Sequence, residues 1–318
     1  MKALQGSEGR PRLIDCAAPV CGAGQVRIRV VAAGLNRADL LQAAGLYPPP
    51  PGVSEILGLE CAGVITEVGE SSSWQVGDRV CALLAGGGMA EEVCVDARHV
   101  LAIPDGLSML EAAAVPEVYA TAWLNVFQLA QVQAGEKVLL HAGASGVGSA
   151  AIQLCKAFHS PCWVSVGSAE RLAYCEGLGA EGGVVRGDNI EGLHDFAPFD
   201  VILDPVGASY AAQNLKMLRL DGRWINIGLM GGRRAELDLA QLLGKRIQLI
   251  GSTLRSRSDA FKGELMAQLA EKVWPLFTSG QLQPQAEEVF AWTDAEAAFE
   301  RLASNQVNGK VVLQISAE

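Results

Sequence analysis

The sequence of 318 residues lacks the features that mark several classes of protein. Its longest apolar stretches fall well short of the roughly 20 residues that span a bilayer. The opening residues, MKALQGSEGR, lack the apolar run of a signal peptide. A basic run is also missing, and the formal net charge of -10 opposes binding to nucleic acid. We therefore expect neither a membrane partner nor a nucleic-acid partner.

Cysteine motifs are missing as well. The eight cysteines are scattered and contain no C-x-x-C pair. Several lie in apolar surroundings, as small core residues do: Cys61, Cys81, Cys155, Cys162 and Cys175. This usage is typical of a reducing cytosol rather than of a disulfide scaffold, so the sequence predicts a cytoplasmic protein.

The strongest functional signal that is present lies between Lys137 and Leu154. An apolar run, Val138 to Leu140, predicts a buried parallel strand, and apolar residues then recur at helical spacing. Between them lie small residues that let a backbone approach a pyrophosphate at a helix N-terminus. The predicted contacts are Gly143, Ser145, Gly146, Val147 and Gly148. The strict pattern G-x-G-x-x-G has glycine where this chain has Ser145, so a plain strand-to-helix turn remains an alternative reading.

The end of the next predicted strand, Cys162 to Val166, indicates which coenzyme is used. Folds that prefer NAD usually carry an acidic residue there, which binds the ribose 2′-OH. This chain has Gly167 and Ser168, followed by Arg171. A hydroxyl and a guanidinium can donate to a 2′-phosphate, so we predict NADPH. The alternative is that Arg171 only covers a helix surface.

Further strands alternate with helical stretches. They are predicted at Phe199 to Leu203, Arg223 to Ile227 and Arg246 to Gly251. Such alternation predicts a parallel sheet that binds ligands at the carboxyl ends of its strands. Gly207, Gly228, Leu229 and Met230 follow two of these strands and are expected to line the coenzyme, although turn chemistry alone would explain the glycines.

The flanking regions differ from this pattern. Before Tyr119, short strands such as Val26 to Ala32 are punctuated by glycine and proline, which predicts a β-barrel or sandwich. After Leu254 we expect a long helix from Asp259 to Phe277. A strand, a helix and a strand are expected near Glu288 to Ala291, Asp294 to Leu302 and Lys310 to Ile315.

Several strings in this order resemble one family. They are NRADL at 36–40, GLYPPP at 45–50, GLECAG at 58–63, GDRV at 77–80, AAAVP at 112–116, HAGASGVG at 141–148 and NGKVVL at 308–313. The chain resembles the zeta-crystallin-type quinone oxidoreductases of the medium-chain dehydrogenase/reductase superfamily, with the closest likeness to the p53-inducible quinone oxidoreductases and their bacterial relatives. The resemblance implies an α/β protein with two domains. A GroES-like β-barrel domain is expected at 1–120 and 255–318, and a Rossmann domain with a doubly wound parallel sheet at 121–254.

The resemblance also implies site residues. Asn36 and Tyr47 match positions that face the interdomain cleft, where Asn36 would donate to an acceptor carbonyl and Tyr47 would supply a proton or gate the cleft. The alternatives are that Asn36 holds a turn and that Tyr47 packs on the prolines. The remaining implied coenzyme contacts are Thr121, Arg186, Ser252, Leu254 and Asn308.

The zinc-dependent alcohol dehydrogenases of the superfamily differ from this chain where they bind metal. They carry a catalytic cysteine at the position of Asn36 and a histidine at that of Leu59, and neither residue present here can ligate zinc. The histidines, His99, His141, His159 and His194, are dispersed and are interpreted as surface or capping residues. We therefore expect no metal.

Without a metal to polarise a simple ketone, the acceptor must take hydride readily. The resemblance implies direct hydride transfer from NADPH to a quinone or an activated enone. An enoyl or alkenal double-bond reductase and a non-catalytic NADPH-binding protein remain alternatives. The resemblance and the apolar edge strand at Arg246 to Leu254 predict a homodimer through the last strand of the Rossmann sheet.

Overall fold

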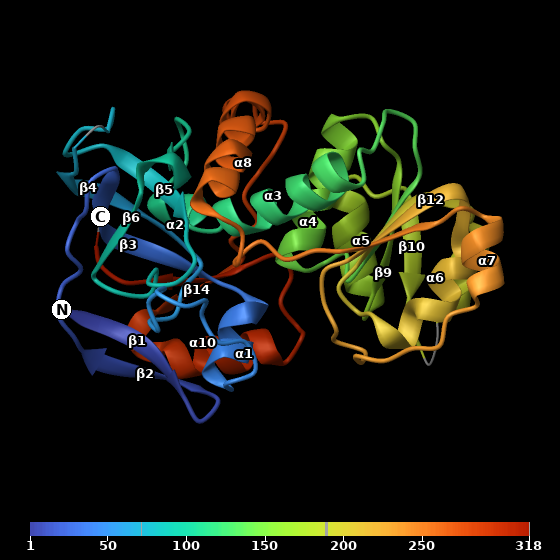
Figure 1. Cartoon of the computed structure of the whole chain (residues 1–318), viewed down its shortest axis with the longest axis horizontal. Coiled ribbons are helices and arrows are strands. Elements are labelled where there is room, and N and C mark those ends of the chain that lie inside the picture. The colour runs from blue at the N-terminus through green and yellow to red at the C-terminus, as the bar shows by residue number, and fades with distance from the viewer. Residues whose placement is uncertain (71, 188–189, 318) are drawn as a thin grey trace. The chain divides into compact units, whose positions relative to one another are not determined.

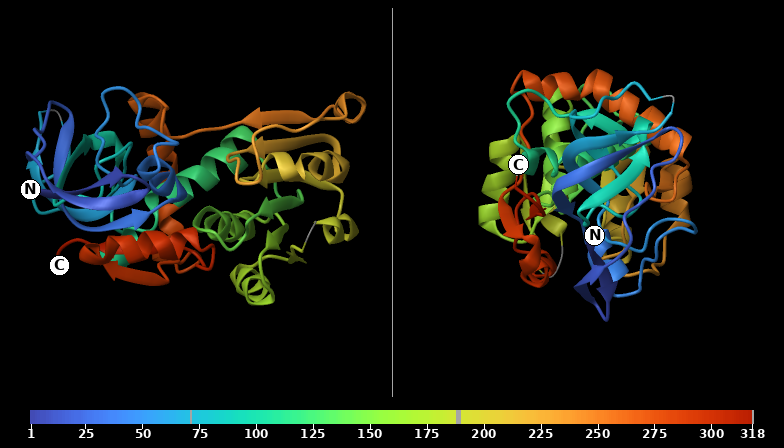
Figure 2. Two further views of the ribbon diagram at one scale, coloured as in Figure 1. Left: turned by 90° about the horizontal axis from the view of Figure 1, so that it is seen from below. Right: turned by 90° about the vertical axis from the view of Figure 1, so that its left-hand side faces the viewer.

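The computed structural model describes residues 1–70, 72–187 and 190–317. The chain forms two compact units: unit 1 is Met1–Ala120 with Leu254–Glu318, and unit 2 is Thr121–Thr253. Both ends of the chain therefore belong to unit 1 (Figure 2). Leu254, predicted as the end of the dinucleotide-binding domain, begins the second segment of unit 1.

Unit 1 is built on a seven-stranded sheet in the order β14-β15-β3-β4-β5-β7, with β6 also paired to β3. A separate hairpin, β1-β2, lies beside α1 and α10 (Figure 1). The strands are β1 (Lys2–Ser7), β2 (Arg10–Asp15), β3 (Gln25–Leu35), β4 (Glu60–Val68), β5 (Arg79–Leu83), β6 (Glu92–Asp96), β7 (Val100–Ala102), β14 (Glu288–Ala291) and β15 (Val311–Gln314). The late strand β15 pairs antiparallel with the early strand β3, so the sheet joins both segments of the unit.

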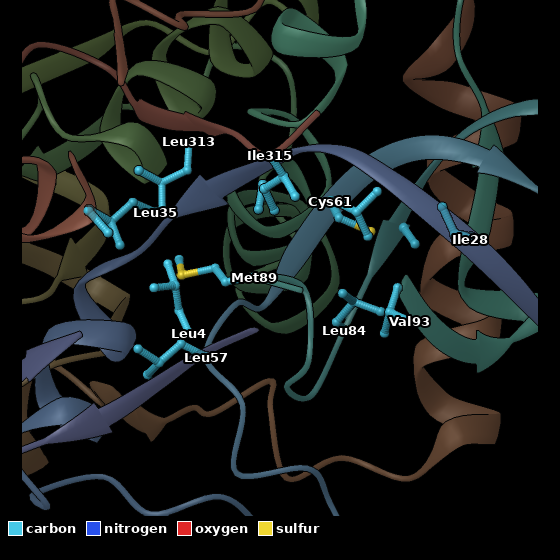
Figure 3. Close-up of a cluster of buried hydrophobic side chains, with 14 of the residues drawn as sticks. Leu4, Ile28, Leu35, Leu57, Cys61, Leu84, Met89, Val93, Leu313 and Ile315 are labelled. Atoms are coloured by element: carbon cyan, nitrogen blue, oxygen red, sulfur yellow. The ribbon is translucent and has the colours of Figure 1, made fainter. Parts of the chain in front are cut away.

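The core of unit 1 follows from the alternation within β3. Val26, Ile28 and Val30 are fully buried while Arg29 between them is exposed, as a strand with one covered face requires. Side chains from distant segments complete this core, among them Leu57 and Leu313 (Figure 3). The GroES-like fold predicted for this region is confirmed.

Helices of unit 1 are α1 (Arg37–Ala43), α2 (Met109–Ala112), most of α3 (Pro116–Ala122), α8 (Asp259–Lys272), α9 (Trp274–Thr278) and α10 (Ala295–Ala303). The prediction of a single long helix from Asp259 to Phe277 is wrong, because the helix is interrupted at Val273, between α8 and α9. Pro275 lacks the N–H of a helix interior and its ring clashes with the carbonyl four residues earlier. The proline therefore sits in the first turn of a new helix.

Unit 2 contains a six-stranded sheet in the order β10-β9-β8-β11-β12-β13, with every pair parallel. The strands are β8 (Val138–His141), β9 (Cys162–Val166), β10 (Gly182–Val185), β11 (Phe199–Asp204), β12 (Leu218–Asn226) and β13 (Gln248–Gly251). This order, 3-2-1-4-5-6 in chain sequence, is that of the dinucleotide-binding fold, and the predicted Rossmann sheet is confirmed. The last strand begins later than predicted, because Arg246 adopts φ 51°.

The helices of unit 2 are α4 (Gly146–Ala157), α5 (Ala169–Leu178), α6 (Ala211–Met217) and α7 (Leu239–Gly244), and a π-helix runs from Trp123 to Leu129. Helix α5 ends at Gly179, whose φ of 118° suits a residue without a Cβ. None of the helices among the described residues has both the length and the apolar character that crossing a membrane demands.

Candidate functional site

The turn between β8 and α4 has the geometry of a pyrophosphate cradle. Ser145 is the N-cap of α4, and its hydroxyl accepts a hydrogen bond from the Gly148 N–H at 3.1 Å. The N–H groups of Gly146 and Val147 at this helix start have no hydrogen-bond partner within the described residues. A Cβ on Gly148 would lie 2.4 Å from the Gly143 carbonyl oxygen, so only glycine permits this close approach. Free N–H groups at a helix N-terminus suit an anion.

Two arginines converge at the end of β9. A Cβ built on Gly167 would lie 3.6 Å from Arg171 Nη1 and 3.9 Å from Arg186 Nε. Arg171 belongs to α5, which begins at the N-cap Ser168, and the Arg186 N–H bonds the Val166 carbonyl at 2.8 Å. The structure thus brings Arg186, which sequence reasoning placed only by resemblance, beside Arg171. Paired guanidinium groups match a phosphate better than a ribose hydroxyl.

The turns after β11 and β12 pack backbone against backbone. Gly207 has φ 82°, and the Gly231 N–H bonds the Val206 carbonyl at 2.7 Å. A Cβ on Gly228 would lie 2.5 Å from the Pro205 carbonyl oxygen. The next residues, Leu229 and Met230, are about half exposed, at 52% and 51%. The turn therefore presents two apolar side chains from a tightly fixed backbone.

Asn36 in unit 1 lies in a buried polar cluster with Glu60 and Lys310. Its Nδ2 donates to Glu60 Oε1 at 2.9 Å and to the Gly34 carbonyl at 3.4 Å, while its Oδ1 accepts from Lys310 Nζ at 2.7 Å. Lys310 Nζ lies 2.6 Å from Glu60 Oε1 and also donates to the Leu35 carbonyl. The bond to Gly34 is the longest of the three that the Asn36 side chain makes with these groups and is therefore the weakest.

Asp39 fixes the backbone on either side of this cluster. Its carboxylate accepts the N–H of Asn36 at 2.8 Å and that of Gly58 at 2.9 Å. Burial raises the pKa of Asp39 to about 6, against the opposing effect of these two hydrogen bonds and of Lys310. The Asn36 side chain and backbone are therefore both held in place.

Tyr47 is held by Arg255, a buried residue that sequence reasoning missed. The guanidinium donates to the carbonyls of Ala85 and Tyr47 at 2.6 and 3.4 Å and to Gln42 Oε1 at 2.7 Å, and it lies 5.4 Å from the centre of the Tyr47 ring. Partial burial raises the pKa of Tyr47, although Arg255 opposes this. The phenol therefore carries its proton at neutral pH, as an unperturbed tyrosine does, and the raised pKa makes it the weaker acid of the two.

The remaining predicted residues are divided between the units. Thr121 lies in α3 and accepts a hydrogen bond at its carbonyl from Asn125 Nδ2 at 2.7 Å. Leu254 and Asn308 belong to unit 1, whereas Ser252 belongs to unit 2. Asn308 Oδ1 and Ser252 Oγ are buried without a hydrogen-bond partner among the described residues. Orphaned buried polar atoms are uncommon and suit contacts to a ligand.

Two of the four histidines do not lie on the surface, so that interpretation is wrong for them. His99 is 4% exposed and hydrogen-bonds the Asp259 carbonyl at 2.9 Å. His141 is 2% exposed and bonds two side chains within unit 2. Their polar partners come from segments far away in the sequence, which periodicity cannot show.

Two family models match the chain. "Alcohol dehydrogenase GroES-like domain" matches residues 22–105, and "Zinc-binding dehydrogenase" matches residues 146–271. The residues present do not fit the zinc of the second description. Leu59 is a buried apolar residue, Asn36 is an amide, and within the described residues no three His, Cys, Asp or Glu side chains are grouped as metal ligands.

Curated proteins that are similar to this chain include VAT-1 homologues. It is 30% identical over 320 residues to the human "Synaptic vesicle membrane protein VAT-1 homolog", covering 93% of this chain and 80% of that protein. It spans 66% of the zebrafish protein of the same name, at 29% identity.

Solved structures also resemble it. The CurK enoyl reductase matches with a TM-score of 0.86 and 29% identity over 98% of both chains. The quinone oxidoreductase of Thermus thermophilus, which was also solved with NADPH, matches with a TM-score of 0.83 and 31% identity over 99% of this chain and 100% of that one. The fold, the two family models and these relatives together show that the chain belongs to the medium-chain dehydrogenase/reductase superfamily of oxidoreductases.

Proposed function

We propose that the protein is an NADPH-dependent reductase of quinones. NADPH is the coenzyme, and its pyrophosphate binds the N–H groups of Gly146 and Val147 at the start of α4. Arg171 and Arg186 bind its 2′-phosphate above Gly167. These assignments rest on the chain's own geometry and on the NADPH complex of the similar Thermus quinone oxidoreductase.

Bound NADPH supplies a hydride to a conjugated acceptor, whose oxygen gains negative charge. The Asn36 amide donates to that oxygen by exchanging its long bond to Gly34, and Lys310 and Glu60 keep the amide oriented. Tyr47 holds the proton that completes the reduction, and Arg255 positions its ring. A quinone or an activated enone suits this site, because conjugation delocalises the added electron pair.

One observation carries the proposal. Asn36, at the position where zinc-dependent relatives have a metal-binding cysteine, is locked into the Glu60–Lys310 cluster as a hydrogen-bonding group. The ammonium and the amide are not zinc ligands, and the single carboxylate of Glu60 falls short of the three or four ligands that zinc needs. We therefore propose that the reaction proceeds without zinc.

An enoyl reductase is the second candidate, and the match to the CurK enoyl reductase favours it. Such an enzyme would use the same coenzyme residues and differ in the acceptor. A protein that binds NADPH with little turnover is a third reading.

The experiment is an acceptor panel with NADPH oxidation as the readout. Purified protein is offered quinones, alkenals and enoyl thioesters at matched concentrations. We expect the highest kcat/KM on quinones. Faster reduction of enoyl thioesters would assign the second candidate, and NADPH binding without turnover on any acceptor would assign the third.

We also propose a homodimer through β13. This strand pairs only with β12 among the described strands, and its Leu249 is 43% exposed. Helix α7 nearby in the sequence exposes Leu239 at 70% and Leu243 at 78%. An edge strand with exposed apolar neighbours favours pairing with a second copy.

A further inference from the structure

A chain of buried polar side chains links four strands of unit 2. Ser165 Oγ lies 2.8 Å from His141 Nδ1, and His141 Nε2 lies 2.9 Å from Asn214 Oδ1. Asn214 Nδ2 donates to Asp204 Oδ2 at 3.0 Å, and Trp224 Nε1 donates to the same oxygen at 3.0 Å. The first four of these residues are at most 2% exposed, and none of them is a predicted coenzyme contact.

The carboxylate of Asp204, at one end of the series, sets the direction of every hydrogen bond in it. The Asp204 carboxylate accepts from Val206, Gly207 and Trp224, and Asn214 turns its NH2 group toward it as a further donor. The Asn214 oxygen then accepts from His141 Nε2–H, which leaves His141 Nδ1 to accept the Ser165 hydroxyl proton. Burial lowers the pKa of His141 and so favours the neutral imidazole, although Asp204 and the Asn214 hydrogen bond oppose the shift. The chain therefore runs one way, from hydroxyl to carboxylate.

Asp204 also shapes the turn that follows β11. Its Oδ1 accepts the N–H of Val206 at 2.7 Å and that of Gly207 at 3.0 Å. With Asn214 and Trp224 on Oδ2, the carboxylate receives two hydrogen bonds on each oxygen. Any change at Asp204 therefore alters the turn whose Gly207 is a predicted coenzyme contact.

The position of the chain in the sheet gives it a role. Ser165, His141, Asp204 and Trp224 belong to β9, β8, β11 and β12, which are adjacent in that order. The order of strands reverses between β8 and β11, and ligands bind at such a switch point. His141 is the last residue of β8, directly before the glycine turn, and Asp204 is the last residue of β11.

We propose that Ser165, His141, Asn214 and Asp204 are positioning residues that hold the turns after β8 and β11 in one relative placement for NADPH. The inference rests on the proposed coenzyme. The four side chains are at most 2% exposed, so their role does not depend on direct contact with the coenzyme. Each acts through the backbone of a turn, so losing one bond lets the two turns relax separately and weakens coenzyme binding.

The test compares two buried serines in the same unit. Ser165→Ala removes the first donor of the chain, and Ser160→Ala removes a hydroxyl that bonds the Gln133 carbonyl at 3.1 Å instead. Both serines are 2% exposed. NADPH dissociation constants are measured by fluorescence titration, and the free energy of unfolding is measured by urea denaturation. We expect Ser165→Ala to weaken NADPH binding about tenfold and Ser160→Ala to leave it within about twofold, at similar losses of stability.

A second pair on α6 provides a larger perturbation. Asn214→Leu breaks the chain in the middle, whereas Leu215→Ala opens a cavity in the adjacent apolar cluster. Weaker NADPH binding for Asn214→Leu than for Leu215→Ala supports the proposal. Equal NADPH affinities within both pairs, with the wild type binding NADPH, would overturn the positioning role and leave the proposed function intact. A wild type that does not bind NADPH would overturn the proposed function itself.

Discussion

Replacing Gly167 by aspartate should convert the coenzyme preference. The backbone at Gly167 is outside the left-handed region, and a Cβ there meets only ordinary van der Waals contacts, the nearest at 3.6 Å. The substitution therefore fits without strain. The new carboxylate would sit between Arg171 and Arg186, pair with their guanidinium groups, and repel the 2′-phosphate that they otherwise bind.

The magnitude follows from the contacts that would be lost. A hydrogen bond to a charged group contributes about 1.5–3 kcal/mol, and solvent exposure of Arg186 favours the lower value. Losing one such bond from each arginine costs about 3 kcal/mol, or roughly a hundredfold in NADPH affinity. NADH has no 2′-phosphate, and its ribose hydroxyl gains an acceptor, so its affinity should stay or improve.

The assay is the dissociation constant of each coenzyme for Gly167→Asp and for its neutral match, Gly167→Asn. The asparagine variant has the same size without the charge and should keep NADPH affinity within about threefold. Arg12→Ala, at an exposed arginine of β2, controls for the general loss of positive charge. Equal losses for the aspartate and asparagine variants would mean that shape rather than charge is sensed, and the reasoning would be refuted.

Three further predictions concern unit 1, unit 2 and the acceptor. Tyr47→Phe should lower kcat on quinones at least about tenfold with NADPH affinity unchanged, and an unchanged kcat would remove Tyr47 as the acid. Lys310→Met removes the ion-pair partner of the buried Glu60 and should lower the free energy of unfolding in urea by about 3–5 kcal/mol. Lys272→Met, on the exposed side of α8, should lower it by less than about 0.5 kcal/mol. A loss below about 1 kcal/mol for Lys310→Met would contradict the ion pair's role. Leu243→Glu should convert the proposed dimer into a monomer by light scattering, and a monomeric wild type would refute the interface.

Sequence patterns predicted the elements that have strong local signals. The buried run Val138 to Leu140 and the small residues after it identified β8 and the glycine turn, because strand periodicity and helix capping are local properties. The predicted long helix after Ser258 extended beyond the observed end of α8, although Pro275 in the sequence is a residue that disfavours a helix interior. The prediction that Arg246 lies in a strand is wrong, because arginine as a residue type gives no indication of the positive φ that it adopts here.

The polar clusters were beyond local patterns. Lys310 and Asn36 lie 274 positions apart and meet only because β15 pairs with β3. The strand Phe199 to Leu203 was predicted, but the bond of the next residue, Asp204, to Asn214 depends on where α6 packs. Charged side chains are rarely buried, and the residues around Glu60 and Arg255 in the sequence do not indicate that these two are. Such residues become visible only when the fold brings their partners together.

The split of unit 1 into two chain segments has a consequence for how the protein is made. Unit 2 is one continuous stretch and can fold while the ribosome is still adding the second segment of unit 1. The sheet of unit 1 must wait, because β15, the neighbour of β3, consists of Val311–Gln314. Until those residues emerge, the end of β3 from Ala32 to Leu35, which β6 does not pair, presents an open, apolar edge of the kind that recruits chaperones or aggregates. Synthesis speed over the segment that begins at Leu254 therefore bears directly on the yield of native protein.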